Sequence, residues 1–92
     1  MAKLKLRHPH SLPRDAAREK VTRIFEKYKD KFGINSRWEG DDLVLYGKGF
    51  DGKAKVGQSE IQVDANLGLA TSLIKGKIES VIREELEQEF KA

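Results

Sequence analysis

INSRWEGDDLVLYGKGFDGKAKVGQSEIQVDANL, residues 34–67, contains four runs in which apolar and polar residues alternate, separated by short glycine-containing segments. Alternation with a period of two is typical of strands that are buried on one face only. The clearest run is the last, where Ile61, Val63, Ala65 and Leu67 alternate with polar residues. The stretch therefore predicts four antiparallel strands joined by tight turns.

A fifth strand precedes this stretch, because residues 3–7 alternate lysine or arginine with leucine. Residues 50–56 allow two interpretations: a tight turn at Asp51-Gly52, a common hairpin dipeptide, or an unbroken strand. We favour the strand because it keeps the period of two. Gly52 then marks a bulge or a place where a helix packs close to the backbone.

Two longer segments have apolar residues at the three-, four- and seven-residue spacings of amphipathic helices. The first covers residues 12–32, with Ser11 as the expected N-cap and Gly33 in the left-handed position that ends a helix. The second covers residues 68–90, and Gly76 predicts a kink near its start. Its expected buried stripe consists of Leu73, Ile74, Ile78, Val81, Ile82, Leu86 and Phe90.

These elements predict an α+β fold: a five-stranded antiparallel sheet with two long helices on one face, in the order β-α-β-β-β-β-α. The opposite face is expected to be polar, which antiparallel sheets commonly tolerate. Its expected residues are Lys3, Lys5, Arg7, Arg37, Glu39, Lys53, Lys55, Gln62 and Asp64. Val44 and Tyr46 are apolar exceptions on that face, and they could form a homodimer contact or a binding patch.

The composition fits one domain spanning residues 1–92. The chain has 38% hydrophobic and 36% charged residues, no cysteine, and no apolar run near the ~20 residues of a membrane span. Residues 1–7 alternate and lack the apolar core of a signal peptide. We therefore expect a cytoplasmic protein without disulfides, thiolate chemistry or a cysteine-based zinc site.

The positive charge is unevenly distributed. Residues 1–33 hold ten Lys and Arg against four Asp and Glu, whereas the rest of the chain is slightly acidic. Such asymmetry can attract polyanions or an anionic surface. A solvated helix face rich in Lys and Arg explains it more simply.

One glycine-rich motif points to nucleotide binding, but its context does not support that function. Residues 47–54, GKGFDGKA, match GxGxxG and nearly match a phosphate-binding P-loop. Both motifs hold phosphate at a helix N-terminus, whereas this segment continues into a strand, and Ala54 replaces the Ser or Thr that binds magnesium. We interpret the segment as a turn.

The histidine and acidic residues of the chain form no clear catalytic motif either. His8 and His10 could bind a metal or shuttle protons, but Pro9 directs them apart. We expect them to interact with the chain entering the first helix. Asp41 and Asp42 lie at a glycine-flanked turn, where turn formation explains them. We predict no catalytic residue, no metal site and no cofactor.

The candidates for a ligand- or surface-binding site are Trp38, Tyr46, Phe50 and Arg37. Aromatic and basic residues interleaved on a sheet can stack nucleobases, but alternation places Trp38 and Tyr46 on opposite faces. We therefore predict no nucleic-acid partner. Trp38 is expected to anchor the core, with the alternative that it lines a pocket between sheet and helices.

Six short segments occur in an order and spacing that resemble a known family. They are Pro9-His10-Ser11-Leu12, Phe32-Gly33, Arg37-Trp38-Glu39-Gly40-Asp41, Asp51-Gly52, Leu67-Gly68-Leu69 and Ile78-Glu79. Over nearly the whole chain they resemble the small polyhydroxyalkanoic acid system proteins, named after genes that lie near those for bacterial polyester storage granules. The resemblance implies this cellular context, and it transfers no catalytic residue. The architecture is also similar to a reduced helix-grip domain.

The resemblance favours a non-enzymatic accessory protein of the polyhydroxyalkanoate system that binds the granule surface or a granule-associated protein. The alternative is a small carrier that holds an apolar, acyl-type ligand under Trp38, Leu43, Phe50 and the C-terminal helix. The chain lacks the additional strands with which larger helix-grip domains enclose a full ligand pocket. An enzyme that depends on His8 or on an acidic residue is the third hypothesis.

Overall fold

The computed structural model describes residues 2–90. Its elements are β1 (Ala2–Pro9), α1 (Arg14–Lys27), α2 (Lys29–Phe32), β2 (Asn35–Glu39), β3 (Asp42–Gly47), β4 (Phe50–Val56), β5 (Glu60–Leu67), α3 (Leu69–Ser72) and α4 (Lys75–Glu89). The predicted order of strands and helical segments is confirmed. Each predicted long helix, however, is divided into one long and one short helix.

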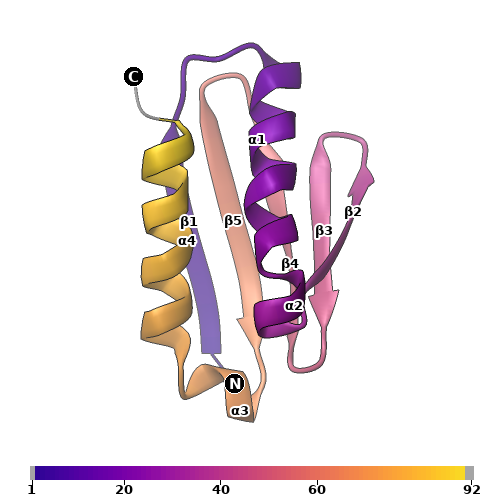
Figure 1. Ribbon diagram of the computed structural model, residues 1–92, viewed down its shortest axis with the longest axis vertical. Coiled ribbons are helices and arrows are strands. Elements are labelled where there is room, and N and C mark those ends of the chain that lie inside the picture. Colours follow the sequence, from indigo (N-terminus) through magenta and orange to yellow (C-terminus); the bar gives the residue numbers. More distant parts are fainter. Residues whose placement is uncertain (1, 91–92) are drawn as a thin grey trace.

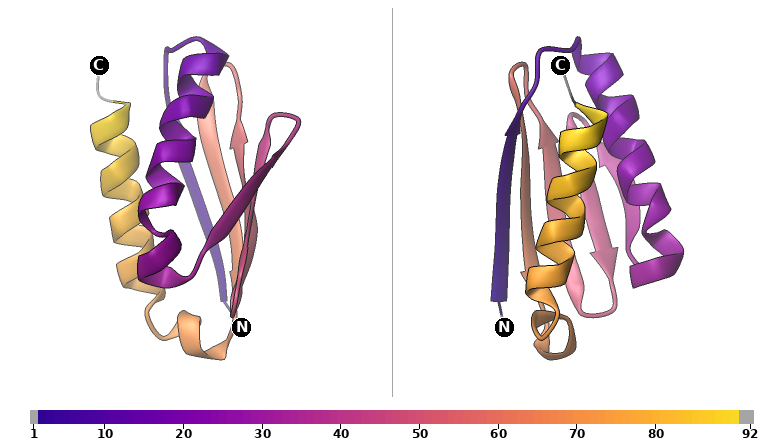
Figure 2. Two further views of the ribbon diagram at one scale, coloured as in Figure 1. Left: turned by 45° about the vertical axis from the view of Figure 1, so that its right-hand side comes forward. Right: turned by 60° about the vertical axis from the view of Figure 1, so that its left-hand side comes forward.

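The five strands form one open antiparallel sheet in the order β1-β5-β4-β3-β2. β1 therefore lies beside the last strand of the chain, and β2 and β1 are the two edges. α1 and α4 lie side by side on the same face of the sheet (Figures 1 and 2). The predicted α+β class and the single helical layer are confirmed.

Alternation decides which side chains meet the helices. Every second residue of β5 is buried, from Ile61 to Leu67, while the residues between them face the other side. Both faces are as predicted from the sequence. The largest fully buried side chains come from β1, β3, β5, α1 and α4: Phe25, Leu4, Ile24, Leu43, Leu45, Ile61, Leu67, Ile78, Leu86, Val21 and Val63.

The two long helices contact each other through charged residues as well as through the core. Lys27 Nζ lies 3.0 Å from Glu85 Oε2, and Lys20 Nζ lies 3.6 Å from Glu89 Oε1. Burial, together with the negative charge of Glu85, raises the pKa of Tyr28 above its usual value of 10.0, so the phenol is neutral at this contact. No helix among residues 2–90 is long and apolar enough to cross a membrane.

The first predicted helix, residues 12–32, begins later than expected and is interrupted at Tyr28. It begins at Arg14, and the residue before it is Pro13, with extended φ and ψ of −56° and 150°, so Ser11 is not the N-cap. The prediction failed because the residue before a proline is biased away from helical geometry. Leu12 precedes Pro13 and therefore lies outside the helix. Tyr28 interrupts the helix with φ −102° and ψ 4°, and Gly33 ends α2 in the predicted left-handed conformation.

The second predicted helix, residues 68–90, differs more strongly from the structure. The kink predicted near Lys75-Gly76 occurs as a full break between α3 and α4 at Leu73 and Ile74, directly before Lys75. The buried stripe of α4 contains Ile78, Ile82 and Leu86. Leu73 and Ile74 were wrongly assigned to it, because the break changes their direction and leaves them 86% and 42% exposed.

β4 is an unbroken strand, as we favoured, and Gly52 pairs with Leu45 on one side and Ala65 on the other. It marks neither a bulge nor a helix contact. A Cβ atom at position 52 would overlap the carbonyl oxygen of Asp64 and lie 2.7 Å from Ala65 Cα. The close neighbour is therefore the backbone of β5, which only glycine can admit at this distance.

We expect Gly52→Ala to lower the free energy of unfolding by about 2–4 kcal/mol, because a strand backbone cannot move away without disturbing its hydrogen bonds. Urea unfolding measures the change. Gly76→Ala is the matched control, since nothing lies within 4 Å of its added Cβ, and it should be neutral or stabilising by up to about 1 kcal/mol. Equal stability of the Gly52→Ala variant and the wild type would contradict the close approach.

Candidate functional site

Trp38 connects the edge strand β2 to helix α1. Its Nε1–H donates to Thr22 Oγ1 at 2.9 Å, and the Thr22 hydroxyl donates to the Arg18 carbonyl oxygen at 2.9 Å. The Arg18 guanidinium carbon lies 4.4 Å from the centre of the indole ring, a cation–π arrangement. Trp38 packs against the core. These contacts fit the core-anchoring role that the sequence predicts for this residue.

The other three candidate residues lie elsewhere. Arg37 and Tyr46 are on the open face of the sheet, with the Arg37 guanidinium 5.9 Å from the Tyr46 ring and 2.9 Å from Glu39 Oε2. Tyr46 is 44% exposed, whereas Phe50 is buried on the helix side. The structure therefore brings Arg37 and Tyr46 together but separates them from Trp38 and Phe50. Ligand binding by these residues and a homodimer through the open face remain predictions.

His10 has a structural position at the opposite end of the sheet. Its Nδ1 accepts a hydrogen bond from the Leu12 backbone N–H at 3.2 Å, and its Nε2 lies 2.8 Å from the Gly57 carbonyl oxygen. The ring of Phe90 lies 5.6 Å from the His10 ring and 6.2 Å from the His8 ring. His10 thus contacts the chain entering the first helix, as predicted. Within residues 2–90 no group of three or more His, Asp or Glu residues could hold a metal ion.

The most exposed apolar residues lie together at one end of the molecule. Leu69 is 80% exposed and Leu73 is 86% exposed, and with Ile74 they form what we call the apolar tip. The tip belongs to α3 and the turn that follows it, below the sheet in Figure 1. The tip could not be predicted from the sequence, because Leu73 and Ile74 continue the spacing of the α4 stripe.

The apolar tip is held in place by hydrogen bonds to the turn between β3 and β4. The Gly68 N–H donates to the Gly49 carbonyl oxygen at 2.9 Å, and the Thr71 hydroxyl donates to the same oxygen. The Ser72 N–H closes the turn of α3 by donating to the Gly68 carbonyl oxygen at 2.8 Å. The leucines are therefore exposed on a well-anchored segment.

An open cleft of about 250 Å³ adjoins the tip, between α2, the start of β4 and the start of α4. Its wall is mainly apolar, with one ammonium group and one hydroxyl group. The lining residues are Lys31, Phe32, Ile34, Phe50, Thr71, Ile74 and Ile78. Phe50 is thus the one predicted binding residue that lies beside the tip.

Four lysines belong to the segments that meet at this end of the molecule, and we call them the lysine collar. Lys31 lines the cleft, and Lys48 lies in the turn that is hydrogen-bonded to α3. Lys75 and Lys77 lie in the first turn of α4. No ion pair in the described part of the chain joins any of the four to a carboxylate. This end of the molecule therefore combines exposed apolar side chains with lysines that make no ion pair within residues 2–90.

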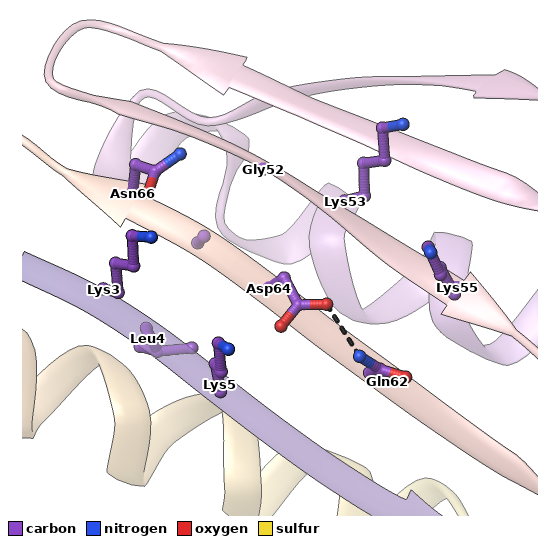
Figure 3. Close-up of a pocket in the computed structure, with 10 residues that line it drawn as sticks. Lys3, Leu4, Lys5, Gly52, Lys53, Lys55, Gln62, Asp64 and Asn66 are labelled. Carbon is purple, nitrogen blue, oxygen red and sulfur yellow. Dashed lines mark hydrogen bonds between the residues drawn. The ribbon is translucent and has the colours of Figure 1, made fainter.

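The open face of the sheet carries a second basic feature, a shallow trough of about 440 Å³. Lys3 and Lys5 of β1 lie along one side of it, and Lys53 and Lys55 of β4 lie along the other (Figure 3). Between them β5 presents polar side chains, and Gln62 Nε2 donates to Asp64 Oδ2 at 2.9 Å. We call these four lysines and the strand between them the lysine trough. The sequence placed all four on this face but could not place β1 beside β5.

Comparison with known families gives one match. The family model of polyhydroxyalkanoic acid system proteins matches residues 4–90, which is nearly the whole chain. The comparisons with curated proteins and with solved structures found no match.

We expect Thr22→Val to lower the free energy of unfolding by about 1 kcal/mol, because valine keeps the shape of threonine but leaves the indole N–H of Trp38 without its acceptor. Trp38 is the single tryptophan, so its fluorescence during urea unfolding reports the change. Thr22→Ser keeps the hydroxyl and should recover most of the loss. If serine and valine destabilised equally, the hydrogen bond would not contribute to the anchor.

Proposed function

The chain belongs to the family of polyhydroxyalkanoic acid system proteins, and on that premise we propose that it is a non-enzymatic accessory protein that binds the surface of polyester granules through its apolar tip. The protein would then be cytoplasmic and associated with granules. The observation that carries this proposal is the exposure of Leu69 and Leu73 on an anchored segment. Clustered apolar exposure of this kind is typical of an interaction surface.

The energy available from the tip is sufficient for reversible attachment. Complete burial of one leucine side chain is worth about 1.5–3 kcal/mol, so two leucines can supply several kcal/mol before the cost of association. Ile74 adds to the same surface, and the adjoining cleft can admit part of an aliphatic chain. An aliphatic polyester surface offers the apolar contact that these residues require.

The lysine collar suits such a surface if the surface also carries anionic groups, such as carboxylate chain ends or lipid phosphates. Lysines beside an apolar patch can keep their ammonium groups in water while the patch inserts. The attachment is therefore expected to weaken as the ionic strength rises.

The non-enzymatic part of the proposal is supported by His10, whose two ring nitrogens are both used in holding the chain around β1 and β5. A histidine that holds two backbone segments in this way has a structural role. The hypothesis of an enzyme that depends on His8 or on an acidic residue is not tested by the contacts of His10, and it is not the function we propose.

A second candidate function is favoured by the cleft. Its volume of about 250 Å³ is smaller than that of a complete ligand pocket, but its apolar wall and Lys31 fit the end of an acyl chain with a carboxylate at the mouth. Trp38 lies under α1 and would not report such binding. Shifts of the Ile74 and Ile78 methyl resonances on adding a medium-chain 3-hydroxy acid would support a carrier, and unchanged methyl resonances would exclude one at this cleft.

Replacing the tip leucines tests the granule proposal. We expect Leu69→Ser combined with Leu73→Ser to reduce binding to purified, protein-stripped polyester granules at least tenfold, because each leucine contributes about 1.5–3 kcal/mol when buried. Sedimentation of the protein with granules measures the bound fraction. Gln58→Ser combined with Gln88→Ser changes two exposed residues remote from the tip and should bind as the wild type does.

Two results would contradict this proposal. Equal binding by the tip variant and the wild type would show that the leucines are not the contact. Binding of the wild type to native granules but not to stripped ones would show that the partner is a granule-associated protein instead of the polyester surface. Unfolding in urea confirms that both variants keep the stability of the wild type, since all four residues are exposed.

A further inference from the structure

Ion pairs between α1 and α4 neutralise part of the positive charge of α1. Arg23 and Lys20 of α1 share Glu89 of α4, and Lys27 pairs with Glu85. In contrast, no ion pair within residues 2–90 involves a lysine of the lysine trough. Lys3 and Lys5 of β1 thus carry part of the basic surplus of the first third of the sequence.

The sheet register arranges these lysines in two rows. Lys5 of β1 and Lys53 of β4 are both paired with Asp64 of β5, from opposite sides. Neighbouring strands lie about 4.8 Å apart and alternate residues about 7 Å apart, so the rows are separated by roughly 10 Å. Figure 3 shows the four lysine side chains rising from the near face of the sheet, with the helices behind it.

From this arrangement we infer that the lysine trough binds a small soluble anion carrying two or more phosphate groups. Four ammonium groups line the trough with one carboxylate, that of Asp64, and the Asp51 carboxylate adjoins it through a hydrogen bond from Asn66. A surplus of positive charge is left for a densely charged ligand. Lysine binds phosphate as a point charge, whereas recognition of carboxylates favours the planar fork of arginine. The trough contains lysine only.

The shape and the remaining side chains narrow the class of ligand further. The trough, about 440 Å³ in volume, is shallow and open, and it is long enough for a small molecule to lie between the lysine rows. Gln62 and Asn66 lie between the lysine rows, and each already donates one amide N–H to a carboxylate, Gln62 to Asp64 and Asn66 to Asp51. The second N–H of each amide group can serve a ligand. No aromatic side chain lines the trough, so stacking of nucleic-acid bases has no platform there. A compact polyphosphate, inorganic or esterified to a small organic group, meets these conditions.

Asp64 provides a test of whether the anion binds between the two lysine rows. Its carboxylate lies between the two lysine rows and repels an anion bound there, while its hydrogen bond with Gln62 can be kept by asparagine. We therefore expect Asp64→Asn to bind phosphates more tightly than the wild type, by roughly threefold.

Nuclear magnetic resonance titration of the full chain with adenosine diphosphate, and separately with inorganic tripolyphosphate, tests this inference. We expect chemical-shift changes confined to β1, β4 and β5, and affinity that falls with salt. Lys5→Gln combined with Lys53→Gln should weaken binding about five- to tenfold. Arg23→Gln combined with Arg83→Gln removes the same charge from the helices and should leave the affinity unchanged.

The inference fails if neither phosphate shifts the trough resonances, or if the helix variant loses as much affinity as the trough variant. It also fails if the chain binds only phosphatidylglycerol vesicles, or binds oligothymidylate more tightly than tripolyphosphate, because the partner would then be a membrane or a nucleic acid. The Leu69→Ser and Leu73→Ser variant should bind phosphates normally. Loss of granule binding and loss of phosphate binding are therefore separable results.

Discussion

The helices are shorter than the strands that they cover, and this difference in length determines where the molecule is open. β1 and β5 have eight residues each, about 27 Å, whereas α1 and α4 have fourteen and fifteen, about 21–23 Å. At the His10 end, the chain around Gly57 closes the core. At the other end, the short helices α2 and α3 provide the remaining cover, and the cleft and the apolar tip lie there.

The two surfaces that we assign differ in chemistry and in position. The apolar tip lies at one end of the long axis, whereas the lysine trough lies on the open face of the sheet (Figures 1 and 3). Attachment by the tip would leave most of the open face in water. The two proposals therefore require different residues and can be true or false independently.

The strands and their faces could be predicted from the sequence because a period of two is a local property. The assignment of Ile61, Val63 and Ala65 to the core needs only the alternation along β5. The single layer of helices could be predicted as well, because only one face of the sheet is apolar. The left-handed conformation of Gly33 was likewise predictable from its place after a helical stripe.

The breaks in the helices were not predictable, because tertiary contacts decide them. Thr71 is bound to the Gly49 carbonyl oxygen, which fixes α3 against a turn that is distant in the sequence. Leu73 then points into water although its spacing fits the buried stripe of α4. The lysine trough was missed for a similar reason, since it exists only because β1 pairs with β5 and brings Lys5 opposite Asp64.

The central claim is that the end bearing Leu73 contacts the polyester surface. The chain has no cysteine, so Leu73→Cys and Gln88→Cys each permit one environment-sensitive fluorescent label, at opposite ends of α4. On adding protein-stripped granules, the account predicts a blue shift for the label at position 73 and an unchanged spectrum for the label at position 88. A blue shift only at position 88, or equal shifts at both positions, would contradict it.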